Sequence, residues 1–160
     1  MNPEPMHESR MDSFDLAILR ALQRDGALTN GALAEIVHLS PSQCSRRRQA
    51  LEAAGIIDGY AARLDRRKLG FGLHAVVRVN LEGHGQDTAR DFAAFVARCD
   101  EVLAAYSVSG DADFVLDVCV RDLDAFAALV HDRLLPHPLV RQIRSEIVLK
   151  TIKESRELPL

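Results

Sequence analysis

The 160-residue sequence has no run of about 18 apolar residues, so it contains no predicted transmembrane helix. Its first ten residues are polar and lack the apolar core of a signal peptide, and residues 1–11 are expected to form a disordered tail. Cysteine is scarce: Cys44, Cys99 and Cys119 are widely spaced and odd in number. We therefore expect reduced, packed thiols in a cytoplasmic protein without membrane contact.

Motifs of common enzyme classes are also missing. The sequence has no nucleophile elbow, phosphate-binding loop or HExxH motif. None of its six histidines has metal-ligand spacing to cysteine or carboxylate residues. These histidines are His7, His38, His74, His84, His131 and His137. We therefore expect no catalytic residues, no metal and no cofactor.

The chain has no excess of positive charge, since its net charge is −3 and its pI is about 6.1. This balance argues against non-specific polyanion binding over the whole surface, but it allows a local basic patch. One candidate patch is "SPSQCSRRRQ", residues 40–49, which contains three consecutive arginines.

The first part of the chain shows helical periodicity. Apolar spacing predicts helices over residues 12–26 and 30–37 and a third helix from Pro41 to Ala54. An N-cap serine, a proline at the first helical position and a glutamine three residues after the cap mark the start of the third helix. "IIDGY" and "AARLD" then resemble two short strands of a hairpin. This order predicts a winged helix-turn-helix domain over residues 12–65, followed by a linker or hinge over residues 66–73.

The third predicted helix has distinct faces at 100° per residue. Cys44, Arg48 and Leu51 point toward the core, an unexpected direction for an arginine. The outward line of this helix consists of Ser42, Arg46 and Gln49, whose side chains can hydrogen-bond to base edges. Arg47 lies on the flank of this line and can reach the DNA backbone. The residues predicted to contact DNA are Ser40, Ser42, Gln43, Ser45, Arg46, Arg47 and Gln49.

The second part of the chain, residues 74–160, alternates strands and helices. Strands are expected at 74–81, 102–109, 114–120 and 140–152, and helices at 86–100 and 122–135. The βαββαβ order predicts a ferredoxin-like domain, which makes the whole chain α+β. Strand residues on both faces are apolar, so the face without helices is expected to pack against a partner sheet in a homodimer.

Several stretches together resemble the Lrp/AsnC (feast/famine) transcriptional regulators. "DLAILRALQRDGALTNGALAEIVHLSPSQCSRRRQALEAAGIIDGYAARLDRRKLG" is similar to the DNA-binding half of this family. "VSGDADFVLDV" and "VRQIRSEIVLKTIKESRELPL" are similar to the turn and the closing strand and tail of its ligand-sensing half. The resemblance covers residues 12–160 in the family's order.

The resemblance implies a regulator of transcription that binds double-stranded DNA. It also implies sheet-to-sheet dimers that associate into tetramers or octamers, with an amino acid or related metabolite bound between sensing domains. The effector residues it implies are Ser109, Gly110, Asp111, Ala112 and Asp113. Their chemistry fits this role, because a carboxylate can hold an ammonium group and a glycine turn exposes N–H groups to a carboxylate.

Two positions depart from the family pattern. Ala112 stands where many relatives have an aromatic residue, and Arg48 stands where they usually have an apolar one. Two alternative functions stay open. One is an architectural DNA-binding protein without an effector. The other is an enzyme similar to the siroheme decarboxylases, which resemble this family in both halves.

Overall fold

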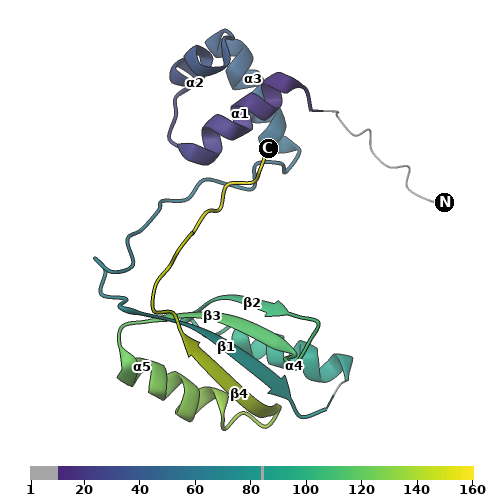
Figure 1. Cartoon of the computed structure of the whole chain (residues 1–160). Coiled ribbons are helices and arrows are strands. Elements are labelled where there is room, and N and C mark those ends of the chain that lie inside the picture. The colour runs from purple at the N-terminus through teal and green to yellow at the C-terminus, as the bar shows by residue number, and fades with distance from the viewer. Residues whose placement is uncertain (1–10, 84) are drawn as a thin grey trace, which may run out of the picture. The chain divides into compact units, whose positions relative to one another are not determined.

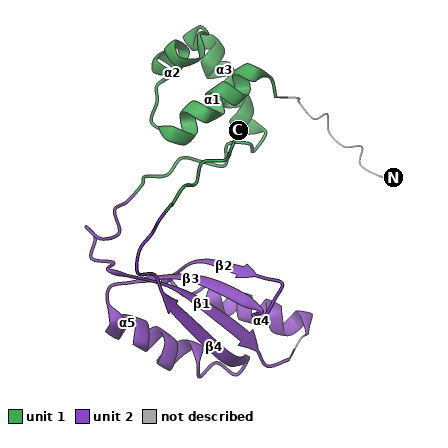
Figure 2. Cartoon of the chain, in the orientation of Figure 1, with its two compact units in different colours: residues 1–63, 153–160 green, residues 64–152 purple. Residues whose placement is uncertain are grey.

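The computed structural model describes residues 11–83 and 85–160, so most of the expected tail, His7 and His84 lie outside the described residues. The chain divides into two compact units (Figure 2). The helical unit comprises the described residues up to Arg63 together with 153–160, and the sheet unit comprises Leu64–Ile152. No helix in the described part of the chain is long and apolar enough to cross a membrane.

Three helices form the helical unit: α1 (Ser13–Arg24), α2 (Asn30–Val37) and α3 (Pro41–Ala53) (Figure 1). The tight turn between α2 and α3 places His38 in the left-handed region, with φ of 56°. The three helices enclose a small apolar core. Its buried members are Ile18, Leu19, Ala21, Leu22, Leu33, Ala34, Val37, Cys44 and Leu51.

The end of α3 follows the sequence prediction, but the expected hairpin after it does not form. Gly55 adopts φ of 68°, and the Ile56 N–H donates to the Leu51 carbonyl at 3.0 Å, which closes the helix. Residues 54–72 contain no strand. An isolated two-stranded hairpin gains little stability by itself. Tyr60, which lies in this stretch, is hydrogen-bonded to α3 side chains instead.

The segment 153–160 belongs to the helical unit, although the sequence pattern assigns it to the second domain. The Gln23 side chain brackets the backbone of Leu158: its amide donates to the Leu158 carbonyl at 3.3 Å and its oxygen accepts the Leu158 N–H at 2.5 Å. Arg20 Nε donates to the Leu160 carbonyl at 2.8 Å. The chain therefore leaves the helical unit, forms the sheet unit and returns.

The sheet unit has the predicted ferredoxin-like order. Its strands are β1 (Leu73–Leu81), β2 (Val102–Ser107), β3 (Phe114–Val120) and β4 (Val140–Ile147), paired antiparallel in the order β2-β3-β1-β4. Its helices are α4 (Gln86–Val96) and α5 (Leu123–Ala128), and α5 continues as the π-helix η1 (Leu129–Leu134).

Both helices cover one face of the sheet, and the core lies between them and that face (Figure 1). The opposite face, which we call the open face, carries Val76, Val115 and Cys119 beside polar groups. Two pairs of charged groups on this face are joined across strands: His74 contacts Asp117, and Arg78 Nε lies 3.3 Å from Glu146 Oε1. All three cysteines are buried free thiols, as expected.

Candidate nucleic-acid interface and ligand loop

The outward line of α3 is exposed as the helix geometry predicts. Ser42, Arg46 and Gln49 all lie on the surface of the helical unit. No described residue pairs with the Arg46 guanidinium, so its donors are available to a ligand. An exposed line of arginine, glutamine and serine can donate to and accept from base edges, which is the composition that a recognition helix requires.

Two of the predicted contact residues hold the start of α3. The Gln43 N–H donates to Ser40 Oγ at 3.3 Å, and the Ser40 N–H donates to Gln43 Oε1 at 3.0 Å. Ser40 Oγ also donates to Gln43 Oε1 at 2.9 Å. This capping box satisfies two N–H groups at the helix start. The Gln43 side chain is thereby engaged within its own helix, and Ser45 is half-buried.

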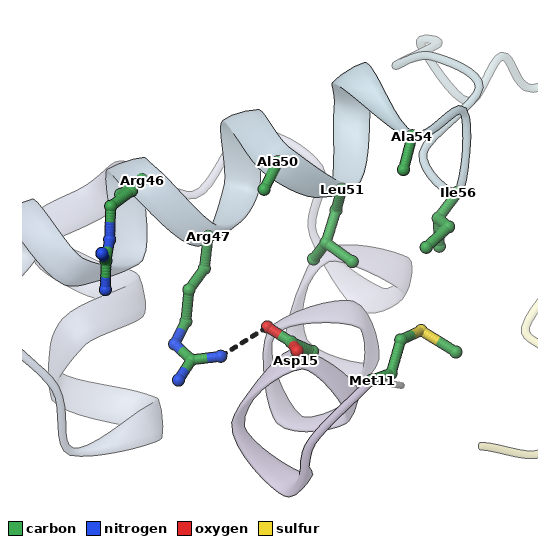
Figure 3. Close-up of a pocket in the computed structure, with 8 residues that line it drawn as sticks. All are labelled: Met11, Asp15, Arg46, Arg47, Ala50, Leu51, Ala54 and Ile56. Atoms are coloured by element: carbon green, nitrogen blue, oxygen red, sulfur yellow. Dashed lines mark hydrogen bonds and ion pairs between the residues drawn. The ribbon is translucent and has the colours of Figure 1, made fainter. Parts of the chain in front are cut away.

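Arg47 joins α3 to the start of α1 (Figure 3). Its Nη1 lies 2.8 Å from Asp15 Oδ1 and 2.9 Å from Asp12 Oδ2, and its guanidinium lies 5.5 Å from the centre of the Phe14 ring. The hydrogen bond to Asp15 raises the pKa of the Arg47 guanidinium. The pKa of Asp12 is lowered, chiefly because its carboxylate accepts the Asp15 N–H and also because it faces Arg47. A phosphate contact by Arg47 would compete with these ion pairs.

A hollow of about 320 Å³ lies between α3 and the beginning of α1. Arg46 and Arg47 line it together with Met11, Asp15 and Leu51 (Figure 3). The two arginines differ in their use. The Nη1 group of Arg47 is bonded to Asp12 and Asp15, whereas Arg46 is exposed beside it and has no partner among the described residues.

Arg48, the arginine at a core angle, has a structural role. Its Nη1 donates to the Leu28 carbonyl at 3.0 Å, and its Nε donates to Tyr60 Oη at 2.8 Å and to Glu52 Oε1 at 3.2 Å. The guanidinium also lies 4.5 Å from the centre of the Tyr60 ring. Tyr60 Oη donates to Glu52 Oε1 at 2.8 Å, and burial followed by this hydrogen bond raises the pKa of Tyr60. Arg48 therefore joins three separate segments of the helical unit.

Replacing Arg48 by alanine is expected to lower the free energy of unfolding of the helical unit by about 1–3 kcal/mol, because the Leu28 carbonyl loses its donor and the Glu52 carboxylate keeps only Tyr60 Oη. The chain has no tryptophan and two tyrosines, one in each unit. Urea titration followed by tyrosine fluorescence in a Tyr106→Phe background therefore reports on Tyr60 alone. Arg24→Ala, an exposed change on α1, is the control. Equal midpoints for both variants would contradict the role assigned to Arg48.

The predicted effector residues form the turn between β2 and β3. The Val108 N–H donates to the Asp113 carbonyl at 3.1 Å, and the Asp113 N–H donates to the Val79 carbonyl at 3.0 Å. Asn80 Nδ2 donates to the Asp111 carbonyl at 2.5 Å. The turn is thus held against the end of β1, and Ser109, Gly110 and Asp111 are exposed.

The two aspartates of the turn have different environments. Asp113 Oδ2 accepts the Leu81 N–H at 2.8 Å, beside the irregularity in the pairing of β1 with β4, so this carboxylate is part of the fold. The Asp111 side chain is exposed and has no partner among the described residues. Ala112 between them is buried, with 5% of its surface exposed. Of the two carboxylates, Asp111 is therefore available to an ammonium group.

Sequence reasoning did not identify the partners of these residues. Asp12 and Asp15 carry a recognisable N-cap pattern, but their pairing with Arg47 depends on how α1 and α3 pack. Asn80 reads as an ordinary strand residue, and only the sheet register brings it beside the turn. Among the described residues, no group of three histidine, cysteine or acidic side chains is placed to hold a metal ion.

Comparison with known proteins agrees with this arrangement. Residues 11–58 match the family model of a winged helix-turn-helix DNA-binding domain. Residues 74–158 match the model of the Lrp/AsnC ligand binding domain. The two matched regions cover the helices and the sheet described above.

Related proteins match over nearly the whole chain. The leucine-responsive regulatory protein of Salmonella typhimurium is 35% identical over 148 residues, which are 92% of this chain and 90% of that protein. The transcriptional regulator AzlB of Bacillus subtilis is 30% identical over 150 residues, covering 94% of this chain and 96% of that protein. A transcriptional regulator of Neisseria meningitidis, solved in complex with L-Met, is 42% identical with a TM-score of 0.90, covering 93% of this chain and 96% of that chain. The chain therefore belongs to the Lrp/AsnC family of transcriptional regulators and is a ligand-responsive DNA-binding regulator.

Proposed function

We propose that α3 reads DNA mainly through Arg46, with Ser42 and Gln49 on the same exposed line. The observation that carries this proposal is the contrast within the three arginines. Arg47 and Arg48 are bonded inside the helical unit, whereas Arg46 is exposed and has no partner among the described residues. An arginine presented in this way can form a bidentate contact with a guanine edge.

We further propose that the effector is an amino acid or a closely related metabolite and that Asp111 contacts its ammonium group. The exposed Asp111 carboxylate and the glycine-containing turn offer complementary partners for the ammonium and carboxylate of such a ligand. The related Neisseria meningitidis regulator was solved with L-Met, which supports testing α-amino acids first.

The open face of the sheet supports a homodimer as the basic assembly. Val76 and Val115 are partly exposed apolar residues on it, and two pairs of neighbouring charged groups, His74 with Asp117 and Arg78 with Glu146, are joined within the sheet, which lowers the cost of covering them. We propose that two such faces pack together and that dimers associate further into tetramers or octamers. An effector bound between sensing domains can then change the balance between two assembly states only if it binds one of them more tightly than the other.

We propose no catalytic activity for this chain and a cytoplasmic location, where regulator and DNA meet.

Arg46→Ala tests the proposed reading face. We expect it to weaken binding to a specific site by about 1–3 kcal/mol, since one bidentate base contact is lost. The site is obtained by selecting duplexes from a random library with the full-length protein, and affinities are measured by fluorescence anisotropy at fixed salt. Arg24→Ala removes the same charge from α1 and should leave affinity unchanged. Unchanged binding by Arg46→Ala would remove Arg46 from the reading face.

A further inference from the structure

Residues 65–71 form one hydrogen-bonded helical turn that is capped at both ends, in the segment that the sequence pattern assigns to a hinge. Asp65 Oδ1 accepts the N–H groups of Arg67 at 3.0 Å and Lys68 at 3.2 Å. At the other end, the Gly70 N–H donates to the Arg67 carbonyl at 3.0 Å and the Phe71 N–H donates to the Arg66 carbonyl at 2.9 Å. Gly70 has φ of 86°, the left-handed conformation of a helix C-cap. We call this segment the basic turn.

The basic turn is fixed to the sheet unit. The Gly72 N–H donates to the Arg121 carbonyl at 3.1 Å, and the Arg121 guanidinium lies 5.5 Å from the centre of the Phe71 ring. A Cβ atom on Gly72 would lie 3.1 Å from the Arg121 carbonyl oxygen, so the two segments approach closely. Residues 58–63, which precede the turn, contain no helix or strand. Because Tyr60 is hydrogen-bonded to α3 side chains, changes of direction along this connection fall on residues 61–64 and leave the basic turn with the sheet.

The turn presents cations that the fold does not use. Arg67 is exposed, and no described residue pairs with its guanidinium. Lys68 is 84% exposed, and its Nζ lies 3.7 Å from Asp65 Oδ2, an exposed pair that contributes little to stability. These two charges stand out in a chain whose net charge is −3. Because the backbone beneath them is already ordered, an anion bound there would not have to order it.

The length of the connecting chain limits the distance between the basic turn and the candidate reading helix. Ile57 packs against the core of the helical unit. Ten residues separate it from Arg67, and a fully extended chain of that length spans at most about 35 Å. This distance equals about one helical turn of B-DNA. The length of the connecting chain therefore allows the basic turn to contact phosphates of a duplex bound by α3.

We propose that Arg67 and Lys68 form a second DNA contact, made by the sheet unit with backbone phosphates within about one helical turn of the α3 site. The proposal rests on the proposed DNA binding by α3. Its ligand is the phosphate backbone, so the contact adds affinity without sequence preference. Through this contact the sheet unit would bind DNA directly, in addition to being covalently linked to the helical unit.

The double variant Arg67→Ala/Lys68→Ala tests the second contact in the full-length protein. Affinity is measured between 50 and 300 mM KCl on a selected duplex that extends 15 base pairs beyond the site on each side. Each lost phosphate contact lowers the magnitude of the slope of log K against log[salt] by about 0.9, so the slope should fall by about 2 units. Affinity should fall several-fold, and by the same factor on unrelated DNA.

Arg90→Ala/Arg141→Ala is the matched control, because it removes two exposed arginines of the sheet unit that lie outside the basic turn, one on α4 and one on β4. It should leave the slope unchanged. An unchanged slope in the Arg67/Lys68 variant, or an equal fall in the control, would overturn the second contact. Failure of the proposed α3 function would look different: the wild-type protein would select no site, or Arg46→Ala would bind its site normally.

Discussion

Phe92→Ala should lower the free energy of unfolding of the sheet unit by about 3–5 kcal/mol, the largest stability effect that we expect from a single substitution. Phe92 is fully buried on α4. Its ring centre lies 5.1 Å from that of Phe114, 6.1 Å from that of Phe95 and 6.0 Å from that of His137. Truncation removes these contacts and leaves a cavity between helix and sheet, which rigid neighbours fill only in part.

The loss is measured by urea unfolding in a Tyr60→Phe background, so that fluorescence reports on Tyr106 in the sheet unit. Leu123→Ala is the control within the same unit. Helical periodicity predicts a core position for Leu123, but 60% of its surface is exposed. Its truncation should therefore cost less than about 1 kcal/mol. Comparable losses for the two variants would mean that the core is not centred on Phe92.

Asp111→Asn should abolish the effector response and leave DNA binding in the absence of effector intact. The substitution keeps the shape of the side chain but removes its charge, and with it the charge-assisted hydrogen bonds to an ammonium group. The exposed side chain has no partner within the described part of the fold, so the variant should fold like the wild type. Thermal shift and DNA affinity are measured with L-methionine and L-leucine at millimolar concentration as probes.

Two variants separate this effect from a general change of charge or stability. Asp124→Asn removes an exposed carboxylate from the first turn of α5 and should keep the full response. Asp113→Ala removes the acceptor of the Leu81 N–H and should lower the melting temperature even without ligand. A wild-type response in Asp111→Asn would exclude this carboxylate from the ligand site.

Local signals in the sequence predicted much of the fold. The serine cap, the N1 proline and Gly55 located both ends of α3, and the apolar alternation located β3 at its observed residues. These features depend on neighbours within a few residues along the chain. The covering of one sheet face by both helices was also predicted correctly, because local periodicity gave the βαββαβ order and that order is typical of a ferredoxin-like fold.

Features that depend on packing could not be predicted. The role of Arg48 requires Leu28 and Tyr60, which are distant in the sequence, to converge on one side chain. The π-helix after α5 has no marker in the sequence, although it positions Arg133 to contact both carboxylate oxygens of Glu101 at 2.7 and 2.8 Å. At the ligand turn, glycine and aspartate types identified the loop, but only the contact with β1 distinguishes the structural role of Asp113 from the free carboxylate of Asp111.

The return of residues 153–160 to α1 makes the sheet unit an insertion within the helical one. The backbone crosses between the two bodies twice, once on each side of the inserted unit. A rotation of one unit relative to the other must therefore twist two connecting segments, each of which is attached to both units. Gln23→Ala removes both hydrogen bonds to the Leu158 backbone and would weaken the attachment of residues 153–160 to α1. If this segment detached, the two units would be joined by one connection, and the range of their relative orientations would widen.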